Sequence, residues 1–178
     1  YDANAAQEAL NQALQELGKS EVTLRLLYGT DESPMDTMAT YLQNAFTKLD
    51  GLNIEMVATT KQDRIYNKMA NGDFDIARNG WVGDYTDPSN MLELFYSTNG
   101  NNDGKFNNAD FDAAIDLSRT TLDSAERSKA LHTAEDILME ETGCIPIAYY
   151  NDFWLQSEKI TGSWHSPNGF WYFMYADI

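Results

Sequence analysis

Apolar positions in the first eighty residues alternate between helical and strand spacing. The opening stretch 2–18 consists of helix formers, with Asp2 at the place of an N-cap and Gly18 where a helix should stop. Three later stretches have the apolar runs and alternation of strands, and two stretches between them repeat apolar residues at helical spacing. We predict strands over 22–28, 52–58 and 74–81, and helices over 34–49 and 61–72.

Strands that alternate with helices of about ten or more residues are joined by right-handed crossovers and form a largely parallel sheet. The sequence therefore predicts an α/β fold in which helices flank a mixed, mostly parallel sheet. No internal repeat or low-complexity linker interrupts the pattern. We expect one domain over residues 1–178.

The second half of the chain is more helical. Apolar spacing predicts helices over 89–96, 110–119 and 124–141. Asp123 and Glu126 stand at the spacing of a capping box before the last of these, although the first place of such a box is usually Ser or Thr.

The C-terminal part is rich in aromatic residues and contains two short apolar runs. We predict strands over 145–150 and 153–158, joined at Asn151 and Asp152. A tail rich in glycine and aromatic residues follows, up to Ile178.

Composition and charge exclude several classes of partner. The apolar fraction is 43%, and no run approaches the roughly 18 to 20 apolar residues that span a bilayer. The formal charge is −16, which repels phosphate backbones and anionic lipids, so we expect no nucleic-acid or membrane-surface partner. The chain begins at Tyr1 without an initiator Met or a signal peptide, and we expect a processed chain or an excised piece.

Few residues of the types used in catalysis or metal binding are present. His132 and His165 have no neighbouring nucleophile motif, and one cysteine without paired histidines does not make a tetrahedral zinc site. Cys144 lies in an apolar run and is expected to be a buried structural thiol. No glycine-rich phosphate loop occurs, and we expect neither an enzyme nor a cofactor.

The polar stretch 99–110 has the spacing of an EF-hand calcium loop at several positions. Its first ligand would be an Asn rather than an Asp, and its twelfth an Asp rather than the longer Glu. A calcium loop, a polar surface loop and a ligand-facing loop all remain open. The positions concerned are Asn99, Asn101, Asp103, Gly104 and Asp110.

Two carboxylates follow the predicted strand 74–81. Asp84 and Asp87 resemble an acid pair of the kind used in glycoside hydrolysis, but carboxylates three apart in a turn are more often caps. Asp87 precedes Pro88 at the entry to a predicted helix, which favours a cap. Asp84 should lie near the carboxyl end of the strand, where open parallel sheets bind their ligands.

Four stretches, in this order and spacing, resemble the extracellular solute-binding proteins of peptide ABC importers, the oligopeptide- and dipeptide-binding type. The resemblance implies one lobe, the second, of a two-lobe fold of the type II periplasmic binding proteins. Residues 151–178 would run back toward the first lobe. The stretches are YDANAAQEALNQALQELG, GDFDIARNGWVGDYTDP, the Asn-rich loop with ADFDAAIDLSR, and AERSKALHTAEDILMEETGCIPIAYY.

The resemblance also implies which residues contact a ligand. Asp84 matches the acid that pairs with a peptide's α-amino group, and Gly80 to Val82 match a strand edge that hydrogen-bonds an extended peptide. Trp81 would form an apolar wall of the cleft, and Arg78 matches a position that can meet the ligand's carboxylate. Asn101 matches a polar residue of the cleft loop.

Two positions depart from the best-known oligopeptide binders, since Gln62 stands where they have a Trp and Met69 where they have an Arg. The family also includes receptors for sugars, nickel complexes and heme. The resemblance implies a monomeric receptor, periplasmic or lipid-anchored at the cell surface, that delivers its ligand to an ABC permease.

Overall fold

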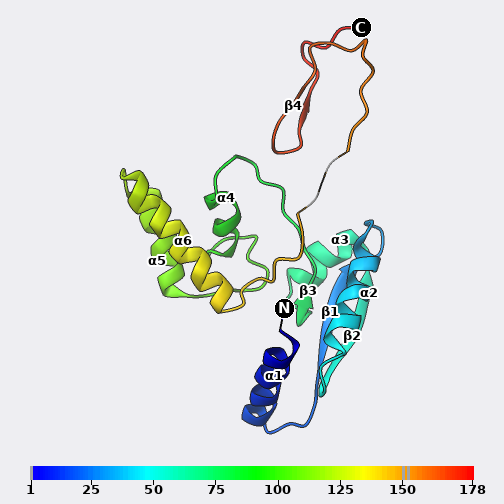
Figure 1. The fold of residues 1–178 in the computed structure, drawn as a ribbon, viewed down its shortest axis with the longest axis vertical. Helices are drawn as coiled ribbons and strands as arrows, with labels where there is room; N and C mark the ends of the chain where they lie inside the picture. Colours follow the sequence, from blue (N-terminus) through cyan, green and yellow to red (C-terminus); the bar gives the residue numbers. More distant parts are fainter. Residues whose placement is uncertain (1, 150, 152) are drawn as a thin grey trace. The chain divides into compact units, whose positions relative to one another are not determined.

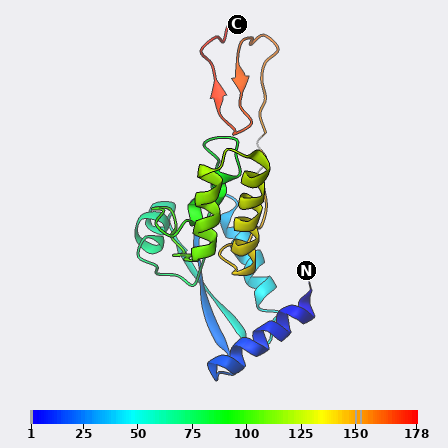
Figure 2. The ribbon, with the colours of Figure 1, turned by 90° about the vertical axis from the view of Figure 1, so that its left-hand side faces the viewer.

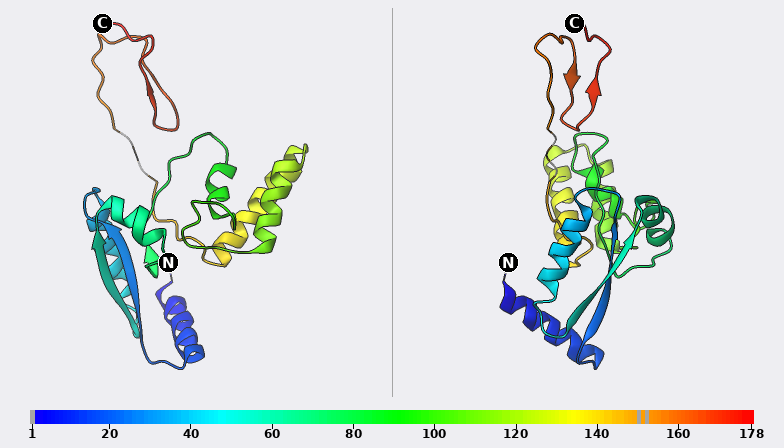
Figure 3. Two further views of the ribbon diagram at one scale, coloured as in Figure 1. Left: turned by 180° about the vertical axis from the view of Figure 1, so that it is seen from behind. Right: turned by 90° about the vertical axis from the view of Figure 1, so that its right-hand side faces the viewer.

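A parallel sheet of three strands forms the centre of the first half of the chain. In the computed structural model, β1 (Val22–Gly29) pairs along its whole length with β2 (Leu52–Thr59) and near its end with β3 (Ile76–Ala77), in the order β2-β1-β3 (Figure 1). The register runs from Val22 opposite Leu52 to Gly29 opposite Thr59, and the left view of Figure 3 shows β1 and β2 side by side. The predicted parallel α/β arrangement is confirmed, although this sheet is wholly parallel rather than mixed.

The structure describes residues 2–149, 151 and 153–178. It divides into two compact units, Tyr1–Gly80 and Trp81–Ile178. In the described residues, no helix is both long and apolar enough to cross a bilayer.

The helices of the first unit begin and end close to the predicted positions. α1 (Ala3–Leu17) starts after Asp2, whose carboxylate accepts two backbone N–H groups of the first turn, and ends at Gly18 with φ 64°. The other helices are α2 (Met35–Phe46), α3 (Lys61–Asp63) and the π-helical turn η1 (Arg64–Met69). The core beneath the sheet is formed by Leu26, Ala39, Leu52 and Ile54.

One predicted strand is much shorter than expected. Residues 74–81 were predicted to be a strand, but only Ile76–Ala77 pair with β1. The N–H of Arg78 still donates to the carbonyl of Leu27, at 3.0 Å. Beyond it the chain departs from β1 and enters the second unit at Trp81, so the last residues of the predicted strand lie outside the ladder.

The second unit is built around a pair of helices, α5 (Ala109–Thr120) and α6 (Ser124–Glu140), which lie side by side in Figure 2. The short helices α4 (Ser89–Leu92) and η2 (Glu93–Phe95) precede them. Their common core includes Phe111, Ile115, Leu131, Ala134 and Leu138.

Capping at the start of α6 follows the sequence only in part. Asp123 accepts the backbone N–H groups of Ala125 and Glu126, as a cap does. The side chain of Glu126 does not complete the capping box, because its carboxylate accepts the hydroxyl of Thr121 instead. The predicted N-cap is confirmed, and the reciprocal bond is replaced by one that fixes the α5–α6 connection.

The C-terminal strands lie further along the chain than predicted. No strand is found in the described parts of 145–150 and 153–158, and Tyr150 and Asp152 lie outside the described residues. The antiparallel pair is β4 (Trp164–His165) with β5 (Trp171–Tyr172). Gly169, with φ 85°, takes the left-handed place in the turn between them. The hairpin therefore forms where a glycine permits the turn.

Candidate functional site

Arg78 lies where the chain leaves the sheet of the first unit. It is a buried residue, and burial, with the nearby charge of Arg64, lowers the pKa of its guanidinium below the ordinary value. Its backbone is held from both sides, because its N–H donates to Leu27 and its carbonyl accepts Nη1 of Arg64 at 2.8 Å. The ligand-binding position inferred from the sequence is thus a cation in a fixed piece of backbone.

Arg64 is the residue that fixes this piece of backbone, and sequence reasoning missed it. Only 1% of it is exposed. Its Nη1 also donates to the side chain of Asn79 at 3.2 Å, and its Nη2 pairs with Glu32 at 2.8 Å. Burial alone would raise the pKa of Glu32, but the hydrogen bonds and charges of Arg64 and Lys61 together outweigh it, and the pKa is lowered.

In the second unit, Trp81 and Asp84 are brought together by a shared acceptor. The amide oxygen of Asn90 accepts the indole N–H of Trp81 and the backbone N–H of Asp84, each at 3.3 Å. Asn90 is buried, whereas Trp81, Val82 and Asp84 are exposed. The Asp84 carboxylate therefore lies on a surface whose backbone is fixed from below, a suitable place for a group that meets an exogenous cation.

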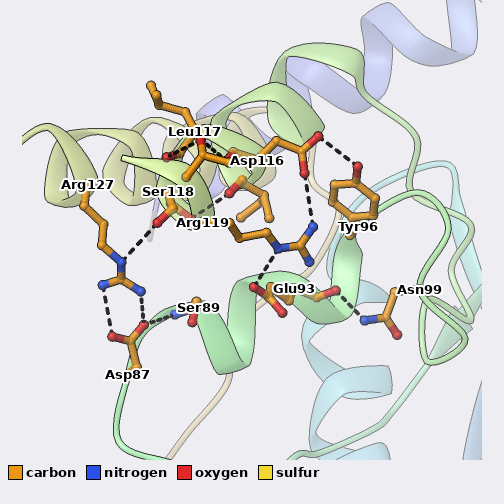
Figure 4. A network of polar contacts seen from close by, with 12 residues as sticks. Asp87, Ser89, Glu93, Tyr96, Asn99, Asp116, Leu117, Ser118, Arg119 and Arg127 are labelled. Atoms are coloured by element: carbon orange, nitrogen blue, oxygen red, sulfur yellow. Dashed lines mark hydrogen bonds and ion pairs between the residues drawn. The ribbon is translucent and has the colours of Figure 1, made fainter. Parts of the chain in front are cut away.

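Asp87 caps the start of α4, as the sequence predicted. Its carboxylate accepts the N–H of Ser89 at 2.9 Å, in the first turn of α4. Both of its oxygens also accept from Arg127 of α6, at 3.0 and 2.9 Å (Figure 4). The bonds from Arg127 and Ser89 hold the pKa of Asp87 well below its usual range. Asp87 is therefore engaged within the protein and does not form an acid pair with Asp84.

A second arginine ties α5 to η2. Nε of Arg119 donates to Glu93 at 3.0 Å, and Nη1 donates to Asp116 at 3.1 Å. The guanidinium also lies over the ring of Tyr96, 4.7 Å from its centroid, and the Tyr96 hydroxyl donates to Asp116 (Figure 4). These contacts fix the chain between α4 and the Asn-rich loop against α5.

The Asn-rich loop 99–110 is organised by an asparagine that the calcium pattern does not include. Asn102 is buried, and its Nδ2 donates to the carbonyl of Phe106 at 2.8 Å while its Oδ1 accepts the N–H of Phe106 at 3.0 Å. The side-chain oxygen of Asn99 accepts the N–H of Asn101. Asp110 already lies in the first turn of α5.

These contacts engage polar groups of the loop in hydrogen bonds within the protein. Over the described residues, no group of three or more His, Cys, Asp or Glu could hold a metal ion. Asn101 is exposed, and within the described chain no hydrogen bond joins it to Trp81, Val82 or Asp84.

Cys144 is partly buried and packs against the core of the second unit. Burial raises the pKa of its thiol, so the thiol is held in its neutral form, as expected of a structural cysteine.

The predicted site residues are divided between the two units of the chain. Arg78 and Gly80 belong to the first unit, and Trp81, Val82, Asp84 and Asn101 belong to the second. Gly80, Trp81 and Val82 are exposed and lie in no strand, so the predicted strand edge is an extension of the chain beyond β3 rather than part of the sheet. Sequence reasoning missed the three residues that hold these groups in place: Arg64, Asn90 and Arg127.

Comparison with known proteins gives consistent matches. The chain is 34% identical over 167 residues to the oligopeptide-binding protein OppA of Bacillus subtilis, covering 90% of this chain and 30% of that protein. It is 35% identical over 166 residues to a dipeptide-binding protein of Lactococcus lactis, covering 91% of this chain and 30% of that protein. The chain thus spans less than a third of the length of these two relatives.

A solved structure supports the same fold. The crystal structure of a peptide-binding protein of a peptide ABC transporter matches 80% of this chain and 63% of its own, with a TM-score of 0.74 and 32% identity. The fold is that of the type II periplasmic binding proteins. Residues 1–103 match the family model described as bacterial extracellular solute-binding proteins, family 5, middle part. The chain therefore belongs to the bacterial extracellular solute-binding proteins of family 5.

Proposed function

We propose that this chain is part of the substrate-binding receptor of an ABC importer, which binds peptides in a cleft between two lobes and delivers them to a membrane permease. The observation that carries the proposal is Asp84. Its carboxylate is exposed beyond the end of β3, on a backbone fixed by Asn90, in a chain whose relatives are named as oligopeptide- and dipeptide-binding proteins.

The proposed binding mode uses groups that every peptide has. The backbone of Gly80 to Val82 offers exposed polar groups to an extended peptide, and Asp84 pairs with its α-amino group, which fixes direction and register. Trp81, half exposed, presents an apolar face to ligand side chains. Arg78 supplies positive charge for the ligand's carboxylate, and Asn101 contributes a polar side chain.

The receptor acts by closing, not by catalysis. An ammonium–carboxylate pair loses hydration on both sides when it is buried, so Asp84 contributes to affinity once the cleft has closed and the ligand's hydrogen bonds are complete. No step of this mode needs a cofactor or a metal. We place the full-length receptor outside the cytoplasmic membrane, either periplasmic or lipid-anchored at the cell surface, as a monomer that contacts its permease.

We assign residues 1–178 to the second lobe of the receptor, with residues 151–178 running back toward the first lobe. Several large apolar side chains of that segment are almost fully exposed, as expected of a surface that a further part of a longer protein covers. They include Phe153, Leu155 and Ile178.

The proposal is tested by Asp84→Asn in the full-length protein that carries this chain. Loss of a buried charge pair should weaken the binding of a free peptide by about 2 to 5 kcal/mol, measured by calorimetry. The same peptide with an acetylated amino terminus should bind the wild type as weakly as the free peptide binds the variant. Unchanged affinity in the variant would place the ligand's amine elsewhere or remove peptides from the possible ligands.

A second measurement concerns the 178-residue chain by itself. Without the opposite wall of the cleft, water is not excluded from Asp84, so this chain should bind peptides weakly or not at all. Micromolar binding by the isolated chain in calorimetry would contradict a site shared between two lobes.

A further inference from the structure

Asn90 combines deep burial with two contacts that both lead to the proposed ligand surface. It lies in α4, has 7% of its surface exposed, and its Oδ1 accepts from Trp81 Nε1 and from the backbone N–H of Asp84. One oxygen thus joins an aromatic side chain to the main chain of a residue three positions later. Both donors lie several positions before Asn90 in the sequence. The shared oxygen therefore sets the spacing between the Trp81 side chain and the Asp84 backbone across the turn.

We propose that Asn90 is a positioning residue of this site, which holds the Trp81 ring and the Asp84 backbone at a fixed spacing before a ligand arrives. This inference rests on the proposed function for its consequence in binding. Its structural half, the restraint of the Trp81 ring, holds for the free protein.

The physical reason for such a residue is the exposure of the groups it restrains. Trp81 is 41% exposed and Asp84 is an exposed residue, so packing alone does not hold them. A ring or a loop that is ordered only on binding loses conformational freedom at that moment, and affinity falls by this cost. An acceptor oxygen beneath the turn removes part of the cost in advance. A Cβ at Gly83 would lie in ordinary van der Waals contact with Asn90 Oδ1, at 3.5 Å, so the turn and the acceptor oxygen are neighbours.

Asn90 itself is held by its place in the helix. Its backbone N–H donates to the carbonyl of Asp87 at 3.1 Å, and Asp87 is bound by Arg127. The acceptor that restrains Trp81 and Asp84 is therefore connected to α6 through a short series of bonds. These bonds connect the exposed turn to the helix pair that forms the core of the unit.

The test uses the full-length protein with three substitutions at this position. Asn90→Ala removes the acceptor, while Asn90→Asp and Asn90→Ser keep an oxygen there. The first readout is the indole N–H resonance of Trp81, assigned by its loss in Trp81→Phe, and its rate of exchange with solvent. In Asn90→Ala this N–H should exchange at least about tenfold faster, and Asn90→Asp should restore most of the protection. Asn107→Ala, an exposed asparagine of another loop, should leave it unchanged.

The second readout is affinity for trialanine with a free or an acetylated amino terminus. Asn90→Ala should weaken binding of the free peptide roughly tenfold, as expected for the loss of an ordinary hydrogen bond or two. In an Asp84→Asn background the same change should have little further effect, since Asn90 acts through the placement of Asp84 and Trp81. An equal loss in both backgrounds would show a general structural role and overturn the proposal.

The two readouts separate the two ideas. If Asp84→Asn does not alter peptide binding, or trialanine does not bind the wild type, the proposed function fails in this form while the exchange of the Trp81 indole still decides the structural half. If exchange is the same in Asn90→Ala as in the wild type, the positioning role is wrong whatever the ligand is. Should Asn90→Ala fold poorly, Asn90→Ser replaces it, because its shorter side chain holds the oxygen farther from Trp81. Its indole exchange should then be faster than that of Asn90→Asp, and equal exchange in the two variants would overturn the positioning role.

Discussion

Arg127 binds both carboxylate oxygens of Asp87, at 3.0 and 2.9 Å, across 40 positions of the sequence. Its Nε also donates to the carbonyl of Ser118 at 3.1 Å, so one guanidinium joins the turn after Asp84 to both α5 and α6. A bidentate pair of this kind fixes orientation as well as distance. The turn that carries the candidate site is therefore joined to the helix pair that forms the core of its unit.

Arg127→Ala should lower the melting temperature of the chain. Loss of the bidentate pair and of the bond to Ser118 should cost about 2 to 4 °C, a modest value because both side chains are partly exposed and solvent screens the charges. Arg127→Lys cannot form the bidentate contact and should recover only part of the loss. Melting followed by circular dichroism measures both, and an unchanged melting temperature in Arg127→Ala would contradict the anchoring role.

The Asp87–Arg127 pair should also produce a defined pH dependence. A carboxyl whose pKa is lower in the folded state stabilises the fold above its unfolded pKa, and this stabilisation is lost as the pH falls through the folded pKa. The unfolded pKa of Asp is about 3.9. The stability gap between the wild type and Asp87→Asn should thus be constant above about pH 5 and shrink below about pH 4. Urea unfolding at a series of pH values measures the gap, and a gap that widens in acid would have the wrong sign.

Sequence patterns predicted the parts of the fold that depend on local chemistry. Asp2 and Gly18 bound α1 because a capping carboxylate and a left-handed glycine act on their own turn of helix. The parallel order of β1, β2 and β3 follows from alternating spacing and crossover geometry. The length of β3 did not, because the sequence pattern does not show that β1 pairs with Ile76 and Ala77 alone.

The same reasoning did not predict the residues that hold the candidate site in place. Arg127 follows Asp87 by 40 positions, and Arg64 precedes Arg78 by 14. No sequence spacing predicts a contact between residues so far apart. The apolar pattern of a predicted helix places an arginine on its exposed face. Asn90 belongs to a short helix, where an amide is unremarkable until its oxygen is seen to accept from Trp81. The exposed residues proposed to contact a ligand were named from the family resemblance, whereas the buried polar groups that hold them depend on tertiary contacts.

Glu32→Gln should strongly destabilise the first unit. The change keeps the shape of the side chain but leaves Arg64, 2% exposed at its side chain, without its carboxylate partner. Removing one partner of a buried ion pair should cost about 3 kcal/mol in the free energy of unfolding. Lys61→Gln is the matched control, since Lys61 pairs with the same carboxylate from solvent, at 3.3 Å and 60% exposure, and its loss should change stability little. Equal effects of the two substitutions in urea unfolding would show that burial of Arg64 does not decide the energetics.

Asn102→Ala should loosen the Asn-rich loop, whereas Asn101→Ala should not. Asn102 is 3% exposed, and its amide both donates to and accepts from the backbone of Phe106, so truncation leaves partly buried backbone groups of Phe106 unpaired. The expected cost is about 2 to 4 kcal/mol in the free energy of unfolding. Asn101 is exposed, and its side chain should be removable with little loss of stability.

Backbone hydrogen exchange over residues 95–106 measures this difference directly. Protection of the Phe106 N–H, which donates to Asn102 Oδ1 at 3.0 Å, should fall in Asn102→Ala and persist in Asn101→Ala. If Asn102 stabilises the loop and Asn101 contacts the ligand, Asn101→Ala should instead weaken peptide binding by the full-length protein without altering its melting temperature. Loss of stability in Asn101→Ala with no change in binding would reverse these two assignments and remove Asn101 from the proposed site.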